Sequence, residues 1–406
     1  MELLSPAGNI EKLRYAYLYG ADAAYVGVGQ LSLRAKADNF SAEQAEEVRR
    51  IKVNKKLYCA LNIYFHQPDM EKLEDIFDEL ETFPFDAFII SDIGIVAPLR
   101  RRFPQAELHL STQANCTNAE AAKVYRDLGF SRIITAREIS LKEIEAIKKA
   151  VPEVELECFV HGAMCLAYSG RCFLSKWMAD RSGNRGGCAH SCRWEYRVLE
   201  EKERPGEYYP LIEGENFTTL LSSKDLCLID HLEDFKNAGV DCLKIEGRMK
   251  SLYYIAVVTR AYRKALDKLN HSGAEDPAPY REELFNVSHR EFCTGFYYGK
   301  EQVEQSTDTS YERHYTFLGT LGAPADIPGR FHLNIKNKIR RGETLEWIGP
   351  DFIKQEDDSF LLFDKKGEAV DEADHGRIHT IQPGFSEARE GFILRRKNKK
   401  KTEKNP

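Results

Sequence analysis

The chain has 406 residues, a formal net charge of −6, 42% hydrophobic residues and 30% charged residues. This is the composition of a soluble globular protein, and the length predicts one large domain with a smaller one. No stretch approaches the roughly 18 apolar residues of a membrane span, and no cationic region followed by an apolar one opens the chain, so we expect a cytoplasmic protein without a membrane anchor.

The first 270 residues alternate β-rich runs with amphipathic helical patterns. Eight runs have strand character: Glu2–Ser5, Ala23–Gly27, Leu57–Asn62, Ala87–Ser91, Glu107–Ser111, Arg132–Ala136, Glu155–Val160 and Cys242–Glu246. Helical patterns lie between most of them, and one begins with a capping signature formed by Ser140 and Glu143. This alternation indicates a parallel sheet, and eight strands predict a closed (β/α)₈ TIM-like barrel over residues 1–272. An open doubly wound sheet is the alternative.

One interval breaks the rhythm. About 80 residues, from 161 to 241, separate the seventh strand from the eighth. A connection of this length is usually functional. The runs Tyr196–Glu200 and Tyr208–Leu211, separated by a turn rich in Glu, Lys, Pro and Gly, predict a hairpin within it.

The chain changes character after the eighth strand. Tyr253–Leu269 predicts the closing helix, and residues 273–310 a linker. Residues 311–394 form short β-like runs punctuated by Gly, Pro and Asp, which predict a small β-barrel domain. Residues 395–406 form a basic tail, which is either a solvated terminus or an arm for a polyanion such as RNA.

Polar residues follow the predicted barrel strands at their C-terminal ends, where barrels of this type build active sites. A loop cap or a satisfied hydrogen bond would explain any one of them, but their convergence favours a functional pocket. From this ring we predict five catalytic residues: Asn62, Gln113, Arg137, Glu246 and Arg248. The sequence contains neither a G-x-S-x-G elbow nor an H-E-x-x-H helix.

Four of the ten cysteines lie in the long insertion, spaced C-x₆-C-x₁₅-C-x₃-C: Cys165, Cys172, Cys188 and Cys192. In a reducing compartment such clustering indicates metal binding or catalysis rather than disulfides. Two pairs of thiolates can close an S₄ site for zinc or for an iron–sulfur cluster. Zinc sites favour tighter pairs, so the six-residue interval favours a cluster. His161 and His190 are possible ligands or orienting groups, and the other six cysteines are expected to be small buried hydrophobes.

Several segments resemble the collagenase-like peptidase family of unassigned catalytic type. The stretches Glu157–Cys165 and Gly170–Ser175 meet the family signature. Further similarities lie in four segments: Glu2–Gly8, Tyr15–Asp22, His109–Asn115 and Leu243–Arg248. The resemblance covers the barrel, and the β-like region resembles the family's additional C-terminal domain. Within the family, the chain is most similar to the branch that hydroxylates tRNA.

The resemblance implies an iron–sulfur enzyme, with a 4Fe–4S cluster on the four cysteines, that makes 5-hydroxyuridine at the wobble position of tRNA and requires prephenate. Some relatives use a cysteine near the last strand, so an exchange of one ligand with Cys242 stays open. Arg137, Arg171 and Arg248 are candidates to bind the carboxylates of the dianionic metabolite, because a guanidinium matches a carboxylate in a fork geometry. We predict two cofactor-binding residues. Arg171 would bind a carboxylate, and His161 would be a ligand or an orienting group.

The RNA is expected to bind the small β domain, the basic tail and the patch Lys336–Arg341. Phe65, Tyr168 or Trp194 could stack an extruded base, with a core role for each as the alternative. Two other functions remain open: a collagenase-like peptidase with unassigned catalytic residues, and a non-catalytic subunit of a heteromeric hydroxylase whose partner is a shorter barrel paralogue.

Overall fold

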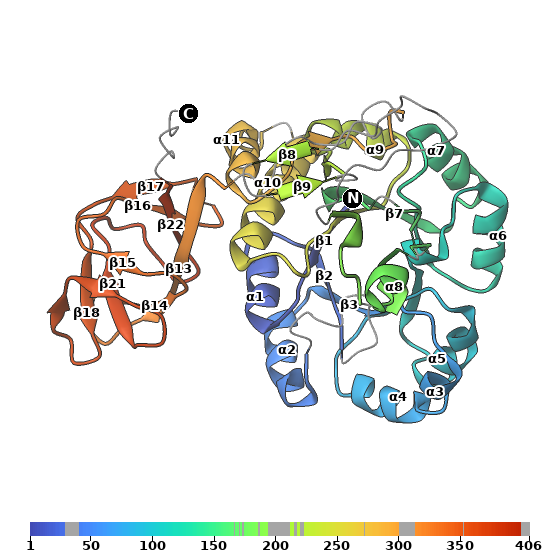
Figure 1. Ribbon diagram of the computed structural model, residues 1–406, viewed down its shortest axis with the longest axis horizontal. Helices are drawn as coiled ribbons and strands as arrows, with labels where there is room; N and C mark the ends of the chain where they lie inside the picture. Colours follow the sequence, from blue (N-terminus) through green and yellow to red (C-terminus); the bar gives the residue numbers. More distant parts are fainter. Residues whose placement is uncertain are drawn as a thin grey trace.

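The computed structural model describes residues 1–28, 40–165, 167–169, 171–172, 174–185, 187–193, 212–214, 217–219, 223–271, 273–299, 313–351 and 353–398. A larger α/β domain and a smaller β domain lie side by side, and the smaller one is next to helices α1 and α10 (Figure 1). Within the described residues, no helix has both the length and the apolar character needed to cross a bilayer.

Eight parallel strands close the larger domain into a barrel. They are β1 (Glu2–Pro6), β2 (Ala23–Val26), β3 (Lys56–Leu61), β4 (Ala87–Ile90), β5 (Glu107–Leu110), β6 (Arg132–Ile134), β7 (Glu155–Ala163) and β11 (Cys242–Ile245). Strand β11 pairs in parallel with both β1 and β7, which completes the ring. The predicted TIM-like barrel is confirmed, and the open doubly wound sheet is excluded by this closure.

Helices cover the outside of the barrel, so its strands are buried on both faces and consist of nearly continuous apolar runs. The main covering helices are α1 (Ile10–Leu18), α2 (Ala45–Lys52), α4 (Leu73–Glu81), α5 (Val96–Arg102), α6 (Ala119–Asp127), α7 (Leu141–Ala150), α9 (Leu232–Asn237) and α10 (Leu252–Asn270). The capping box of α7 is confirmed: the Ser140 backbone N–H donates to Glu143 Oε2 at 2.7 Å, and the Glu143 N–H donates to Ser140 Oγ at 3.4 Å.

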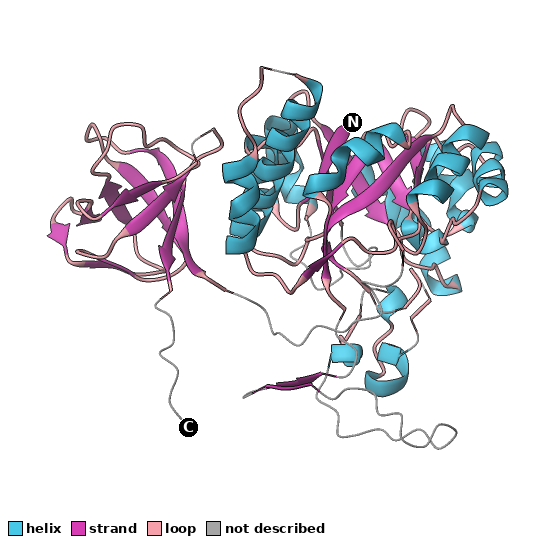
Figure 2. Cartoon of the chain, turned by 90° about the horizontal axis from the view of Figure 1, so that it is seen from above, coloured by secondary structure: helices cyan, strands magenta, loops and turns pink. Residues whose placement is uncertain are grey.

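The insertion after β7 contains the short helix α8 (Leu174–Ala179) and two antiparallel strands, β8 (Ile212–Gly214) and β9 (Phe217–Thr219). The β8–β9 hairpin stands away from the barrel (Figure 2). The predicted hairpin, over Tyr196–Glu200 and Tyr208–Leu211, lies outside the described residues. The insertion ends with β10 (Asp225–Cys227), which pairs antiparallel with the end of β7.

The predicted linker over 273–310 is wrong for its first part. This segment forms helix α11 (Ala278–Glu282), a 3₁₀ turn and strand β12 (Phe292–Cys293), which pairs with β10 and so joins the barrel sheet. The reason is burial, since Tyr280 and Leu284 are completely enclosed in the barrel core. Residues 300–312 lie outside the described part.

The smaller domain is one antiparallel sheet in the order β17-β16-β22-β13-β14-β21-β18-β19, and it resembles a half-barrel. Its strands are β13 (Tyr315–Pro324), β14 (Phe331–Ile335), β16 (Leu345–Ile348), β17 (Gln355–Asp357), β18 (Leu361–Asp364), β19 (Ala369–Val370), β21 (His379–Gln382) and β22 (Ile393–Lys397), with the separate pair β15 (Ile339–Arg340) and β20 (Glu372–Ala373). Leu318, Trp347, Phe360 and Leu394 belong to its own apolar core.

The predicted start of the basic tail at residue 395 is wrong. Residues 395–397 belong to β22, which pairs with β13 and β16 in the middle of the sheet. The Arg395 side chain is completely buried between Glu283 and Glu346, so this cation serves an internal ion-pair network. Residues 399–406 lie outside the described part.

Buried polar contacts join the two domains. The Tyr19 hydroxyl on α1 donates to the backbone carbonyls of Ile348 (3.1 Å) and Gly391 (3.0 Å). Arg260 on α10 donates to the Gly349 carbonyl at 2.7 Å. The smaller domain is therefore attached to the side of the barrel through α1 and α10.

Candidate functional site

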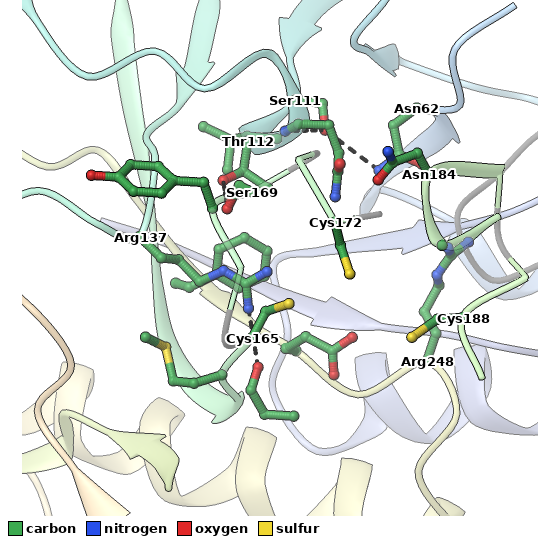
Figure 3. Close-up of a pocket in the computed structure, with 18 of the residues that line it drawn as sticks. Asn62, Ser111, Thr112, Arg137, Cys165, Ser169, Cys172, Asn184, Cys188 and Arg248 are labelled. Carbon is green, nitrogen blue, oxygen red and sulfur yellow. Dashed lines mark hydrogen bonds between the residues drawn. The ribbon is translucent and has the colours of Figure 1, made fainter. Parts of the chain in front are cut away.

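A pocket of about 190 Å³ opens at the C-terminal ends of the barrel strands. Side chains of six strands form its floor, the loops after β3, β5, β6 and β11 contribute to its rim, and the insertion after β7 forms one wall (Figure 3). This is the end of the barrel at which the sequence predicts an active site.

The structure brings together nine of the predicted site residues around this pocket: Asn62, Gln113, Arg137, Cys165, Cys172, Cys188, Cys192, Glu246 and Arg248. They come from five separate segments of the chain, and they become neighbours only when the barrel closes and the insertion lies against it. Their placement agrees with the strand-end argument, while their chemical roles stay predictions.

Local contacts hold the polar rim in place. The Asn62 side-chain amide donates to Ser111 Oγ at 3.4 Å, and the Gln113 backbone N–H donates to the same oxygen at 3.3 Å. Arg137 donates to the Ala163 carbonyl at 3.0 Å, and its guanidinium lies 4.8 Å from the centroid of the Phe159 ring. The rim therefore presents oriented amide and guanidinium groups.

The four clustered cysteines share the insertion side of the pocket. In Figure 3 the sulfur atoms of Cys165, Cys172 and Cys188 point into a common space between Arg137 and Arg248. Among the described residues, no three His, Cys, Asp or Glu side chains lie close enough to hold a metal ion as they stand.

The other six cysteines are poor candidates for ligands, as the sequence predicts. Burial raises the pKa of all six thiols, to about 11 at Cys116 and Cys227 and to about 12 at Cys158. A metal ligand must be a thiolate, which burial in apolar surroundings disfavours. By position and donor chemistry, the four pocket cysteines are thus the set that fits an iron–sulfur cluster.

The alternative ligand Cys242 lies at the wrong end of the barrel. It is completely buried at the start of β11, and its Sγ is 3.5 Å from Glu2 Oε1 on β1. Glu246, which lines the pocket, is four residues further on, so Cys242 sits roughly 13 Å below it along the strand direction.

Hydrogen bonds tie the cysteine loops to the barrel and to each other. The Ser169 backbone N–H, between Cys165 and Cys172, donates to Glu138 Oε1 at 2.9 Å, and Ser169 Oγ lies 3.3 Å from Thr112 Oγ1. Around the second cysteine pair, the Arg181 guanidinium donates to the carbonyls of Gly187 and Cys188, both at 3.0 Å. The Ala189 N–H donates to Ser175 Oγ at 2.5 Å, which links the segments that follow Cys172 and Cys188.

The predicted roles of His161 and Arg171 in cofactor binding are not supported, because neither residue lines the pocket. His161 is 1% exposed, and its ring packs against Tyr254, Tyr262 and Phe292. The cause is a register shift: Lys244 pairs with Phe159, but the next residue, Ile245, pairs with His161. One extra residue reverses the alternation of side chains, so His161 faces the outer helix layer. Arg171 is exposed in the cysteine loop.

Burial of His161 makes the stability of the protein depend on pH. Burial lowers the pKa of His161 to about 3, so the unfolded chain binds a proton below about pH 6.5 that the folded protein does not. As the pH falls from about 6.5 to 4, we expect His161 to lower the free energy of unfolding by about 1.4 kcal/mol for each pH unit. Denaturant titrations of His161→Gln should show a flatter pH dependence than the wild type, whereas His375→Gln, at an exposed position, should follow the wild type.

The predicted RNA-binding cations of the smaller domain are paired with carboxylates. Lys336 lies 3.1 Å from Glu11, and Lys338 lies 3.0 Å from both Glu372 and Asp374. Arg341 has an acidic neighbour as well. These contacts reduce the positive potential that the run Lys336–Arg341 predicts.

The three candidate stacking aromatics have different surroundings. Tyr168 lines the pocket and is 57% exposed. Phe65 is half-buried against the barrel core. Trp194 lies outside the described residues. Tyr168 is therefore the aromatic that the structure places at the site.

The sequence predictions missed one charged residue of the pocket, Lys244. Lys244 lies in the middle of β11, is 4% exposed and lines the pocket. The signal was present, because a lysine stands between Leu243 and Ile245 in an otherwise apolar strand, two residues before the predicted Glu246. A charged residue buried in a strand requires a partner, and that partner is identified below.

Comparison with known proteins finds one peptidase family over both domains. The sequence model of peptidase family U32 matches residues 8–307, and that of the peptidase family U32 C-terminal domain matches residues 313–395. The chain is 36% identical to tRNA hydroxylation protein P1 of Bacillus subtilis, over 92% of this chain and 89% of that one. It is 37% identical to 23S rRNA 5-hydroxycytidine C2501 synthase of Escherichia coli, over 66% of this chain and 40% of that one. It is also 32% identical to a collagenase of Porphyromonas gingivalis, over 75% of each.

Proposed function

The chain belongs to peptidase family U32, and on this premise we propose that it is an iron–sulfur enzyme that hydroxylates the wobble uridine of tRNA to 5-hydroxyuridine, with prephenate as a required metabolite. The observation that carries the proposal is the meeting of four cysteines, two arginines and an exposed tyrosine at one pocket. The names of two relatives concern RNA hydroxylation, on tRNA in one case and on rRNA in the other. Because tRNA is the proposed substrate, we also propose a cytoplasmic location.

Two of the pocket hydroxyls, those of Ser111 and Thr112, lack the contact that a hydrolytic nucleophile needs. A serine or threonine nucleophile needs a hydrogen bond to a basic side chain. Here Ser111 Oγ bonds to the Asn62 amide, and Thr112 Oγ1 donates to the Thr135 carbonyl at 3.1 Å. These partners are neutral, and neither takes up a proton at neutral pH.

Each part of the site has a distinct task in the proposal. Cys165, Cys172, Cys188 and Cys192 would hold the cluster, which when bound would hold or activate the species that donates oxygen. Arg137 and Arg248 bind the carboxylates of the metabolite through their guanidinium groups. The amides of Asn62 and Gln113 hydrogen-bond to the edge of the uracil, because an amide offers both donors and acceptors.

The test begins with anaerobic purification, followed by iron, zinc and acid-labile sulfide analysis and a visible spectrum. The protein is then incubated with prephenate and with tRNA from cells that lack this protein. The nucleosides of the tRNA are analysed by mass spectrometry. Iron with matching sulfide and new 5-hydroxyuridine would support the proposal. Zinc alone, or gelatin cleavage by protein without iron, would favour a peptidase. Activity that appears only after a shorter paralogue is added would favour the subunit alternative.

Removal of the Tyr168 ring is expected to weaken RNA binding. Stacking of a base on an aromatic ring contributes about 1–3 kcal/mol, so Tyr168→Ala should raise the KM for tRNA roughly 10- to 100-fold. Tyr168→Phe keeps the stacking surface and should stay near the wild type. Steady-state kinetics with tRNA as the varied substrate measure both, and an unchanged KM for Tyr168→Ala would remove Tyr168 from the RNA site.

A further inference from the structure

The floor of the pocket carries a charged side chain to which the proposed function gives no task. Seven residues from the barrel strands line the pocket: Tyr25, Ala60, Ile89, Ile134, Phe159, Ala163 and Lys244. Of these, Lys244 alone is charged. Burying a lysine is costly unless it is paired, so its position demands an explanation.

A buried ion-pair network holds Lys244 from below. Its Nζ lies 2.7 Å from Oε1 of Glu157, which is completely buried, and the other oxygen of Glu157 lies 3.3 Å from Arg132. Arg132 also pairs with Glu2 at 2.7 Å and with Glu155 at 2.5 Å. Burial raises the pKa of Glu157, but the charges of Lys244 and Arg132 outweigh this and keep it below its ordinary value. A charged carboxylate fixed by two cations keeps the ammonium in one position.

The ammonium retains donors for a ligand. It carries three N–H groups, and Glu157 accepts one of them. The ring centroids of Tyr25 and Phe159 lie 4.5 and 5.3 Å from Nζ, so apolar faces flank the charge near the floor. In such surroundings, a hydrogen bond from the ammonium to an anion is stronger than in water.

The remaining charges of the pocket favour an anionic ligand above this lysine. Arg137 and Arg248 line the same pocket, and Glu246 is the one carboxylate among its described lining residues. The three cations come from two different sides of the cavity, β11 with its loop and the loop after β6. A small acid could thus meet cations at the floor and at the rim.

We propose that Lys244 is a ligand-binding residue of this pocket, and that its ammonium donates to a carboxylate oxygen of the small acid bound there. Glu157 is the positioning residue, acting through Lys244. The inference rests on the proposed function in one respect, namely that a small acid occupies the pocket.

The test measures prephenate binding by calorimetry on anaerobically purified full-length protein. Lys244→Met removes the ammonium, and the double variant Lys244→Met with Glu157→Gln also removes the carboxylate that would otherwise lose its partner. We expect both variants to bind prephenate about 10- to 100-fold more weakly, because a hydrogen bond to a charged group is lost. The control Lys250→Met, on the loop after β11 and away from the pocket lining, should bind like the wild type.

The iron content and melting temperature of the double variant should stay near those of the wild type, which separates lost binding from lost folding. Wild-type affinity in the double variant, or a wild-type protein that does not bind prephenate, would overturn the inference. The proposed function is judged separately, by iron and by 5-hydroxyuridine in the wild type. The wild-type protein could lack iron and make no 5-hydroxyuridine, yet bind prephenate more weakly when Lys244 is substituted. That outcome would support the role of Lys244 and contradict the proposed function.

Discussion

Replacement of Cys165 with alanine is expected to remove most of the iron from the anaerobically purified protein and to lower RNA hydroxylation by about 100-fold or more. Cys165 is the exposed member of the four pocket cysteines, and its loop is bonded to the barrel rim through Ser169 and Glu138. Loss of one thiolate leaves three ligands, and because metal binding is coupled to folding, the insertion should also become more sensitive to protease. Iron and sulfide analysis, the visible spectrum and limited proteolysis measure these effects.

The matched control is Cys227→Ala. Cys227 is also partly accessible, but it lies on β10, outside the pocket, and burial raises its pKa to about 11. This variant should keep the iron and sulfide of the wild type. Unchanged iron in Cys165→Ala would count against the assignment of the four cysteines, whereas equal loss in both variants would point to general destabilisation.

Arg395→Met is expected to destabilise the protein by about 3–5 kcal/mol, because it leaves buried carboxylates without their cation. The guanidinium is completely buried; it lies 2.6 Å from Glu346 on β16 and also pairs with Glu283, which follows α11. It further donates to the Tyr253 hydroxyl on α10 at 2.6 Å. The substitution therefore weakens the smaller domain and its attachment to the barrel together. The midpoint of urea unfolding, followed by tryptophan fluorescence, measures the loss.

Arg340→Ala is the control for this experiment. Its side chain is 56% exposed and lies 3.8 Å from Glu372, so the pair is screened by solvent and should contribute less than about 1 kcal/mol. Arg395→Met with the wild-type midpoint would show that the network is not needed for stability. The triple replacement of Arg395, Glu283 and Glu346 by apolar residues of similar size should recover part of the loss, since no buried charge then remains unpaired.

The barrel could be predicted from sequence because its signals are local. Each strand is a short apolar run between polar turns, and the cap of α7 is formed by residues three apart. The position of Asn62, Gln113, Arg137, Glu246 and Arg248 could also be predicted, since all parallel strands of a barrel end at the same face. The grouping of the four cysteines in the insertion is visible in the sequence without any knowledge of the fold.

Errors arose where a side chain's direction or partner depends on distant segments. His161 continues the inward alternation of Glu157 and Phe159 in sequence, but the shift in register between β7 and β11 turns it outward. The charges of residues 395–397 predict a solvated tail, although these residues form a strand. Arg395 is buried because it pairs with Glu283 and Glu346, which are distant in sequence.

By itself, the sequence determined the order of the eight barrel strands, the barrel face that carries the polar residues, and the grouping of four cysteines in the insertion. All of these depend on the periodicity or spacing of residues close together in the chain. Only the tertiary structure decided which charges act at the pocket. Lys336 and Lys338 are paired with carboxylates more than 30 residues away in sequence, whereas Lys244 is held at the pocket floor by Glu157, a residue of another strand. The effect of a charge depends on the partners within a few ångströms, and the fold chooses those partners.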